Sequence, residues 1–164
     1  MPINWKCCHT ISVVIPALNE EKNIYSSVSK IICSPHVHEV IVVDGGSEDR
    51  TANLAQKAGA TVLVHDKPYY LGGGRGGQIK AGITQASGDV VAIVHADTIV
   101  PSKLFRRMIT ALNSRPSVIG GSVGCRFKNG AGFKLRIIEF LNDARAIFFS
   151  ISFGDQVQFF AVNQ

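Results

Sequence analysis

Short apolar runs that alternate with helix-like stretches constrain the fold of this chain more than any other feature. The run 39–44, Glu-Val-Ile-Val-Val-Asp, holds four consecutive apolar residues, which is typical of a strand buried on both faces of a parallel sheet. Similar runs lie at 10–16, 61–64 and 90–94. Helical patterns follow them over about 20–33, 51–58, 77–86 and 101–113. Four strand–helix units in a row predict an α/β fold, with a doubly wound, mostly parallel sheet between two layers of helices.

Local signals mark where the predicted helices begin and end. Asn19 is the predicted N-cap of the first helix, because an Asn side chain can accept a hydrogen bond from the first turn. Gly59 closes the second helix and Pro101 opens the fourth. A glycine-rich loop over 69–77 leads into the third helix.

Composition describes an ordinary globular domain. The chain has 164 residues, of which 46% are hydrophobic and 18% charged, and this excludes a disordered or fibrous polymer. It has no apolar leader segment near Met1 and no stretch approaching the ~18 apolar residues of a membrane span, so we expect a cytoplasmic protein. The four cysteines form no CxxC pair and are expected to be reduced. A zinc site stays an alternative, although its spacing matches no ligand pattern. Its ligands would be Cys7, Cys8, His9, His36 and His38.

The second half of the chain differs in charge and pattern. Residues 1–100 hold 8 Lys and Arg against 9 Asp and Glu, whereas residues 101–164 hold 9 against 3, so the net charges are −1 and +6. A strand is predicted over 117–127, and an apolar helix over 133–151 fits either core packing or a membrane surface. The basic excess suits a solvated face, an anionic membrane, a phosphorylated substrate or nucleic acid. No basic and aromatic stacking motif is present, so we expect no nucleic acid partner.

Carboxylates follow three of the predicted strands. Ligands of open α/β sheets bind beyond the carboxyl ends of the strands, where Glu20, Asp44 and Asp97 are expected to meet. Asp97 is the metal candidate, because a hard carboxylate beside an anionic ligand suits Mg²⁺ or Mn²⁺, and the hydroxyl of Thr98 could assist. A single acid at such a place can also be only a turn former or helix cap.

The glycine-rich segment 72–77 is a candidate phosphate site. Its backbone is free to approach an anion, Arg75 can donate a pair of hydrogen bonds, and a helix N-terminus lies directly behind it. Three of its glycines also fit the pattern G-x-G-x-x-G, so a dinucleotide site is an alternative. Against that alternative, seven residues, 65–71, separate the preceding strand from the first glycine.

These residues also carry a family resemblance. Segments 12–21, 39–51 and 86–98 resemble, in order and spacing, the opening motifs of family 2 glycosyltransferases with the GT-A fold. Segments 120–127 and 154–156 resemble a bacterial subgroup with a Gly-Asp-Gln motif. The resemblance implies an enzyme that moves a sugar from a nucleotide-diphosphate sugar to an acceptor with help from Mg²⁺ or Mn²⁺. The apolar, basic second half suggests a lipid-like acceptor and peripheral contact with the inner face of a membrane.

The resemblance assigns roles to individual residues by their position in the motifs. Asp44 would contact the base, Arg75 the diphosphate, and Asp97 the metal. The other donor-binding positions are Pro16, Ala17, Asn19, Glu20, Gly45, Asp89, His95 and Ala96.

The chain departs from the family pattern in two ways. His95 stands where the first acid of the DxD element is expected. The usual catalytic base is expected beyond Gln164, which leaves Asp155 as the nearest acid. Residues 1–115 are therefore expected to form the nucleotide-sugar-binding half, and 116–164 the beginning of an incomplete acceptor half. A truncated or degenerate module that binds nucleotide sugar without transfer is the alternative function.

Overall fold

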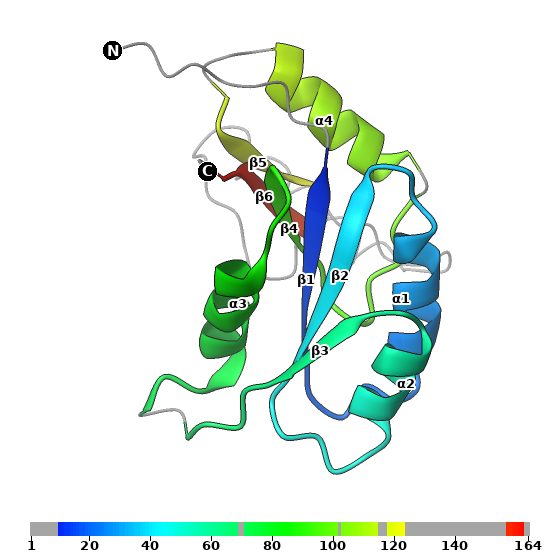
Figure 1. Cartoon of the computed structure of the whole chain (residues 1–164), viewed down its shortest axis with the longest axis vertical. Coiled ribbons are helices and arrows are strands. Elements are labelled where there is room, and N and C mark those ends of the chain that lie inside the picture. Colours follow the sequence, from blue (N-terminus) through cyan, green and yellow to red (C-terminus); the bar gives the residue numbers. More distant parts are fainter. Residues whose placement is uncertain (1–9, 69–70, 102, 115–117, 124–156, 163–164) are drawn as a thin grey trace, which may run out of the picture.

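The computed structural model describes residues 10–68, 71–101, 103–114, 118–123 and 157–162. Within them a six-stranded sheet has the order β3-β2-β1-β4-β6-β5 and is flanked by helices (Figure 1). The strands are β1 (Ile11–Ala17), β2 (Val37–Asp44), β3 (Thr61–Val64), β4 (Val90–Ile93), β5 (Gly120–Val123) and β6 (Val157–Ala161). The helices are α1 (Ile24–Ile32), α2 (Thr51–Lys57), α3 (Gly74–Gln85) and α4 (Leu104–Ser114).

The first four strands form the parallel sheet that the sequence predicts. β1 pairs in parallel with β2 on one side and with β4 on the other, and β3 pairs with β2. Strand order therefore reverses at β1, and the carboxyl ends of β1, β2 and β4 open onto the same edge. The prediction of a mostly parallel α/β sheet is confirmed.

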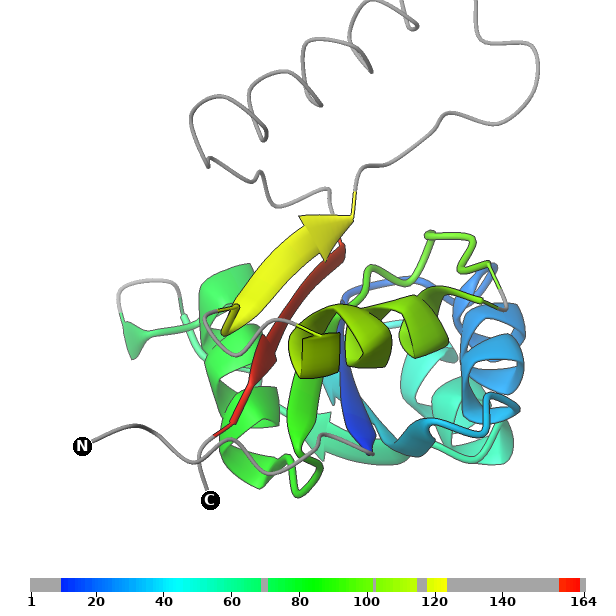
Figure 2. The same cartoon turned by 90° about the horizontal axis from the view of Figure 1, so that it is seen from above.

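Two antiparallel strands complete the sheet. β6 pairs with β4, and β5 pairs with β6 at the outer edge (Figure 2). The sequence predicts a strand around β5 but none at β6, because five residues with two adjacent phenylalanines give too short a pattern to identify. The predicted helix over 133–151 lies outside the described residues.

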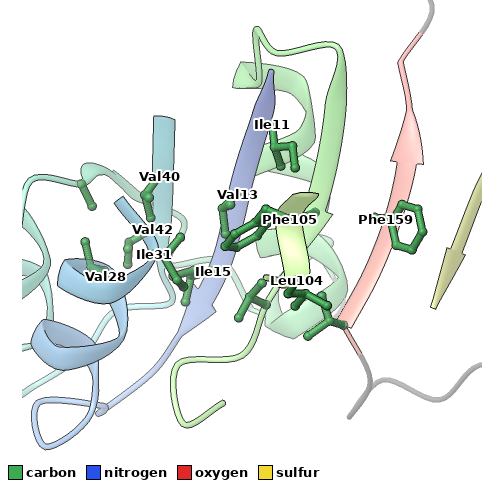
Figure 3. Packing of buried hydrophobic residues seen from close by; sticks show 14 of the residues in the cluster. Ile11, Val13, Ile15, Val28, Ile31, Val40, Val42, Leu104, Phe105 and Phe159 are labelled. Atoms are coloured by element: carbon green, nitrogen blue, oxygen red, sulfur yellow. The ribbon is translucent and has the colours of Figure 1, made fainter. Parts of the chain in front are cut away.

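Both faces of the sheet are covered, which explains the uninterrupted apolar runs. On one face Val13 and Ile15 pack with Ile31 of α1 and Phe105 of α4 (Figure 3). On the other face, where Figure 1 shows α3, Val14 belongs to a second cluster of apolar side chains. Successive residues of β1 point to opposite faces, so each face needs its own apolar residue.

Helix α3 lies unusually close to the sheet. A Cβ at Gly82 would stand 2.4 Å from Cγ1 of Val14, so only glycine allows this approach. The chain reaches Gly82 from a helix that begins at Gly74, inside the glycine-rich segment that the sequence predicts to be a loop as far as residue 77.

The first and fourth helices begin later than predicted. Asn19 has a φ of 56° and does not cap α1, which begins at Ile24 after a turn. Its side chain instead accepts a hydrogen bond from the backbone N–H of Glu48 in a neighbouring loop. Similarly α4 begins at Leu104, whose N–H bonds the carbonyl of Pro101. In the described part of the chain no helix is long and apolar enough to cross a membrane.

A carboxylate ties three segments together at the amino edge of the sheet. Oε1 of Glu39 on β2 accepts hydrogen bonds from the hydroxyl of Ser12 on β1, at 2.7 Å, and from the N–H and hydroxyl of Ser87, at 2.8 and 2.7 Å. Partial burial raises the pKa of Glu39, but these hydrogen bonds and the nearby charge of His38 outweigh burial and hold the pKa below its usual value of 4.5.

This carboxylate makes the fold sensitive to acid. Because the pKa of Glu39 is lower in the folded state, its stabilisation is complete above pH 4.5 and is lost as the pH falls through the folded-state pKa. We expect Glu39→Gln to lower the free energy of unfolding at pH 7 by about 1 kcal/mol and to flatten its decrease below pH 4.5. Urea unfolding at pH 7 and pH 4 measures both effects. Glu48→Gln, at an exposed carboxylate, should change neither, and equal behaviour of the two variants would contradict the assignment.

Candidate functional site

The loops that follow β1 and β2 are joined by hydrogen bonds at the carboxyl edge. The N–H of Gly45 bonds the carbonyl of Ala17 at 2.9 Å. The N–H of Asn19 bonds the hydroxyl of Ser47 at 2.9 Å, and Oδ1 of Asn19 accepts from the N–H of Glu48 at 3.0 Å. Backbone N–H groups beyond the ends of the two strands thus find their acceptors in the neighbouring loop. These hydrogen bonds hold the two loops in one arrangement.

The same two loops meet again near the start of α2. The N–H of Glu20 bonds Oγ1 of Thr51 at 2.8 Å, and the N–H of Glu21 bonds Oδ2 of Asp49 at 3.1 Å. Desolvation raises the pKa of Asp49, but hydrogen bonds from Thr51 and from backbone N–H groups have the larger effect. The pKa of Asp49 is therefore below its usual value. Nε of Arg50 lies 3.2 Å from Oε2 of Glu21. This ion pair is exposed and adds little to stability, because solvent screens it.

Asp44 ends β2 as a buried carboxylate. It is 3% exposed, and its Oδ1 accepts hydrogen bonds from the N–H and hydroxyl of Ser47 at 2.8 and 2.7 Å. The Ser47 hydroxyl therefore links the N–H of Asn19 to the Asp44 carboxylate. These bonds orient the carboxylate through one oxygen, and Oδ2 has no hydrogen-bond partner among the residues that the structure describes.

Gln78 is a site residue that the sequence did not reveal. Its side chain is 6% exposed, and its Nε2 donates to the carbonyl of Ala17 at 2.9 Å. A Cβ at Gly45 would lie 2.3 Å from this nitrogen, so Gly45 makes room for it. Gln78 fixes α3 against the carboxyl end of β1. The one signal in the sequence is that Gln78 follows Arg75 by three residues, which puts both on the same face of a helix.

The glycine-rich segment makes a tight turn before α3. Gly72 has a φ of 81°, a conformation that favours glycine. A Cβ at Gly73 would lie 1.6 Å from the carbonyl oxygen of Lys67, and one at Gly77 would lie 1.8 Å from that of Gly72. The compact turn places Arg75 in the first turn of α3 with its side chain exposed.

His65 connects this turn to the end of β2. Its backbone N–H bonds the carbonyl of Asp44 at 2.7 Å, and its ring Nε2 lies 3.1 Å from the carbonyl oxygen of Gly72. Since a carbonyl oxygen only accepts, Nε2 must carry a proton to make this bond. No local pattern points to His65, because its hydrogen-bond partners belong to other segments.

Asp97 lies beyond β4 at the same edge. The N–H of Val94 donates a hydrogen bond to the carbonyl of Val14 at 3.0 Å. The chain is therefore bonded to β1 up to the residue before His95. Ala96 is buried and His95 is half-buried, whereas Asp97 is exposed and makes no hydrogen bond or ion pair with another described residue. Thr98 bonds the carbonyl of His95 through its N–H.

Metal binding at this edge would depend on a ligand. Among the described residues, no group of three or more His, Cys, Asp or Glu side chains could hold a metal ion. Mg²⁺ is commonly bound by one or two carboxylates together with phosphate oxygens and water, and Asp97 fits that arrangement. Of the alternative zinc ligands, Cys7, Cys8 and His9 lie outside the described residues.

The structure brings most of the predicted donor-binding residues to one edge, but not Asp89. Oδ2 of Asp89 accepts from the N–H and hydroxyl of Thr10, both at 2.9 Å, and the N–H of Asp89 bonds the same hydroxyl. This residue precedes β4, at the end opposite to Asp97. Asp89 therefore lies at the amino edge, away from the other predicted donor-binding residues, and its contact with the donor stays a prediction. Asp155 lies outside the described residues.

This chain is similar to known proteins in sequence. Residues 12–162 match the family model described as glycosyl transferase family 2. An uncharacterized glycosyltransferase of Mycobacterium tuberculosis is 30% identical over 111 residues, which cover 68% of this chain and 47% of that protein. Glucosyl-3-phosphoglycerate synthase of the same organism is 37% identical over 105 residues, which cover 61% of this chain and 32% of the synthase.

Solved structures of that synthase share the fold. Its complex with Mn²⁺, uridine diphosphate and glucosyl-3-phosphoglycerate has a TM-score of 0.62 and 27% identity, over 93% of this chain and 57% of the synthase. Its complex with Mg²⁺ and uridine diphosphate has a TM-score of 0.63 and 27% identity, over 93% and 56%. The chain thus spans less than two thirds of the length of these relatives.

The bond between His65 and Gly72 makes a testable contribution to the site. We expect His65→Ala to speed amide hydrogen exchange in residues 71–77 and to leave exchange in β1 and β4 unchanged, because only the turn before α3 loses its support. The free energy of unfolding should fall by about 1 kcal/mol. His38→Ala, at an exposed histidine of the amino edge, is the control. Unaltered exchange in 71–77 would show that the ring does not hold the turn.

Proposed function

Because the chain belongs to glycosyl transferase family 2, we propose that it binds a nucleotide-diphosphate sugar at the carboxyl edge of its sheet and serves in transfer of the sugar to an acceptor. The observation that supports this proposal is that Asp44 ends β2 and Asp97 follows β4 at the edge where strand order reverses, while Arg75 lies in the first turn of α3, which Gln78 fixes to the end of β1. The uridine diphosphate in the solved relatives supports a uridine nucleotide as the donor.

The nucleoside would lie against the joined loops after β1 and β2. Oδ2 of Asp44 would accept a hydrogen bond from an N–H of the base, while Ser47 holds the other oxygen. Pro16 and Ala17 are buried in β1 and would form the floor, and Asn19 and Glu20 would form the rim. Gly45, which has no side chain, would leave room above Gln78.

The diphosphate would lie near the start of α3. The exposed Arg75 guanidinium can donate two parallel hydrogen bonds to phosphate oxygens, and the helix N-terminus carries a partial positive charge. Both favour the negative charge that develops on the leaving nucleotide as the bond to the sugar breaks. The turn held by Gly72 and His65 would keep Arg75 in place at no cost in reorganisation.

Asp97 would hold Mg²⁺ or Mn²⁺ jointly with the diphosphate. When bound, such an ion supplies Lewis-acid stabilisation of the phosphate oxygens. The Mn²⁺ and Mg²⁺ in the solved relatives support this cofactor. His95 and Ala96 would position Asp97 beyond the end of β4. Because residue 95 is a histidine, Asp97 would be the one carboxylate that the DxD element contributes.

The acceptor would be a small anionic molecule with a hydroxyl group. The solved relatives include a complex with phosphoglyceric acid, which offers no support for the lipid-like acceptor and the membrane contact predicted from the basic second half. In transfer, the acceptor oxygen forms a bond to the anomeric carbon, the bond to the diphosphate breaks, and a base takes the hydroxyl proton. Asp155 remains a candidate for that base, and residues 1–115 remain the proposed donor-binding half.

Metal dependence tests the role of Asp97. Calorimetric titration with uridine diphosphate should show tighter binding with Mn²⁺ than without it. Asp97→Asn should abolish this gain and leave the metal-free affinity unchanged. We expect the affinity measured with Mn²⁺ to fall about tenfold or more, because replacing even a residue that only hydrogen-bonds to a metal ligand costs at least that factor. Glu48→Gln should keep the gain. A Mn²⁺ effect that survives Asp97→Asn would exclude Asp97 as the ligand.

Two further variants separate the base from the diphosphate. Asp44→Asn keeps the shape of the side chain but changes its acceptor into an amide, and should weaken binding of uridine and uridine diphosphate about tenfold while sparing pyrophosphate. Arg75→Gln should weaken pyrophosphate and uridine diphosphate by a similar factor while sparing uridine. Calorimetry measures all six affinities. If both variants lost all three ligands equally, the proposed division of the site would be wrong. Sugar transfer by this chain would rule out the binding module without activity.

A further inference from the structure

A second cleft lies between α1 and the segment that follows β4. Its volume is about 180 Å³, and one wall is residues 96–100. The other wall is polar and comes from α1 and the turn before it, with Lys22, Ser26, Ser27 and Lys30 among its residues. Figure 1 shows α1 and α3 on opposite sides of the sheet, so this cleft lies on the face away from Arg75.

The size of the cleft decides what it can hold. Pockets that enclose a whole drug-sized ligand measure about 300–1,000 Å³. The cleft lies below that range, so it suits a phosphate group with part of a small molecule better than a whole nucleotide sugar.

Three polar side chains of the cleft have no protein partner among the residues that the structure describes. Neither Lys22 nor Lys30 forms a salt bridge with a residue that the structure describes. Ser27 is 8% exposed, and its Oγ has no hydrogen-bond partner within the described part of the chain. A buried hydroxyl without a partner is costly, and most such groups in folded proteins are satisfied. With Asp97 on the opposite wall, the cleft carries two positive charges against one negative charge.

We propose that this cleft binds a phosphate group, free or as the monoester of a small molecule. The ammonium groups of Lys22 and Lys30 match its charge, and the hydroxyls of Ser26 and Ser27 can donate to its oxygens. The cleft borders the proposed metal site along Ala96, Asp97 and Thr98, whereas its two lysines lie on the other wall. Phosphate binding here does not depend on the proposed donor site and is separable from it.

Paired charge variants test the cleft. Calorimetric titration of the full chain with inorganic phosphate and with glycerol 3-phosphate should show binding. The double variant Lys22→Gln/Lys30→Gln should lower the affinity about tenfold or more. The double variant Lys57→Gln/Lys80→Gln removes the same charge from exposed positions on α2 and α3, and should bind as the native chain does. Ser27→Ala should weaken phosphate binding. The variant should unfold at nearly the same temperature as the native chain, because the Ser27 hydroxyl bonds no described residue.

The possible results are distinct. Equal losses in the two double variants would mean unspecific charge attraction, and a loss confined to Arg75→Gln would place phosphate at α3; either result overturns the proposal. Glycerol 3-phosphate binding more tightly than phosphate supports a small phosphorylated ligand, and equal binding supports recognition of the group alone. Lys22→Gln/Lys30→Gln should bind uridine diphosphate normally. A native chain that binds phosphate in the cleft but no uridine diphosphate would refute only the donor site.

Discussion

The structure depends on the complete burial of β1. This strand is covered by helices on both faces and paired in parallel on both edges, with β2 on one side and β4 on the other. A strand in that position must be apolar at nearly every residue, and its two neighbours must end at the same edge of the sheet. Polar groups that follow these strands then meet at the reversal of strand order, where the chain leaves the sheet.

The edge itself is held by hydrogen bonds between loops. Ser47, Gln78 and His65 each satisfy a polar group of a neighbouring segment, and each lies beside a residue proposed to contact the donor. A site that must favour developing charge benefits from groups already in place, because their reorganisation would otherwise raise the barrier. The tight glycine turn contributes in the same way, since it lets backbone segments approach more closely than side chains would permit.

Charge is divided between the two faces of the sheet. Arg75 stands at the start of α3, whereas Lys22 and Lys30 border the cleft beside α1. Asp97 lies at the edge and takes part in the wall of that cleft. This separation gives two cationic places, one proposed here to bind a nucleotide diphosphate and one proposed to bind a phosphate group.

The amino-acid sequence by itself determined the first five strands, most helices and the acids at the strand ends, because apolar periodicity and turn residues act between near neighbours in the chain. It therefore placed Asp44 and Asp97 correctly at one edge. Only the tertiary structure decided the pairing of β6 with β4, the bond that draws Asn19 away from α1, and the positions of Gln78 and His65. Gln78 bonds a carbonyl 61 residues away, and no local pattern encodes a contact that exists only after the sheet has brought distant segments together.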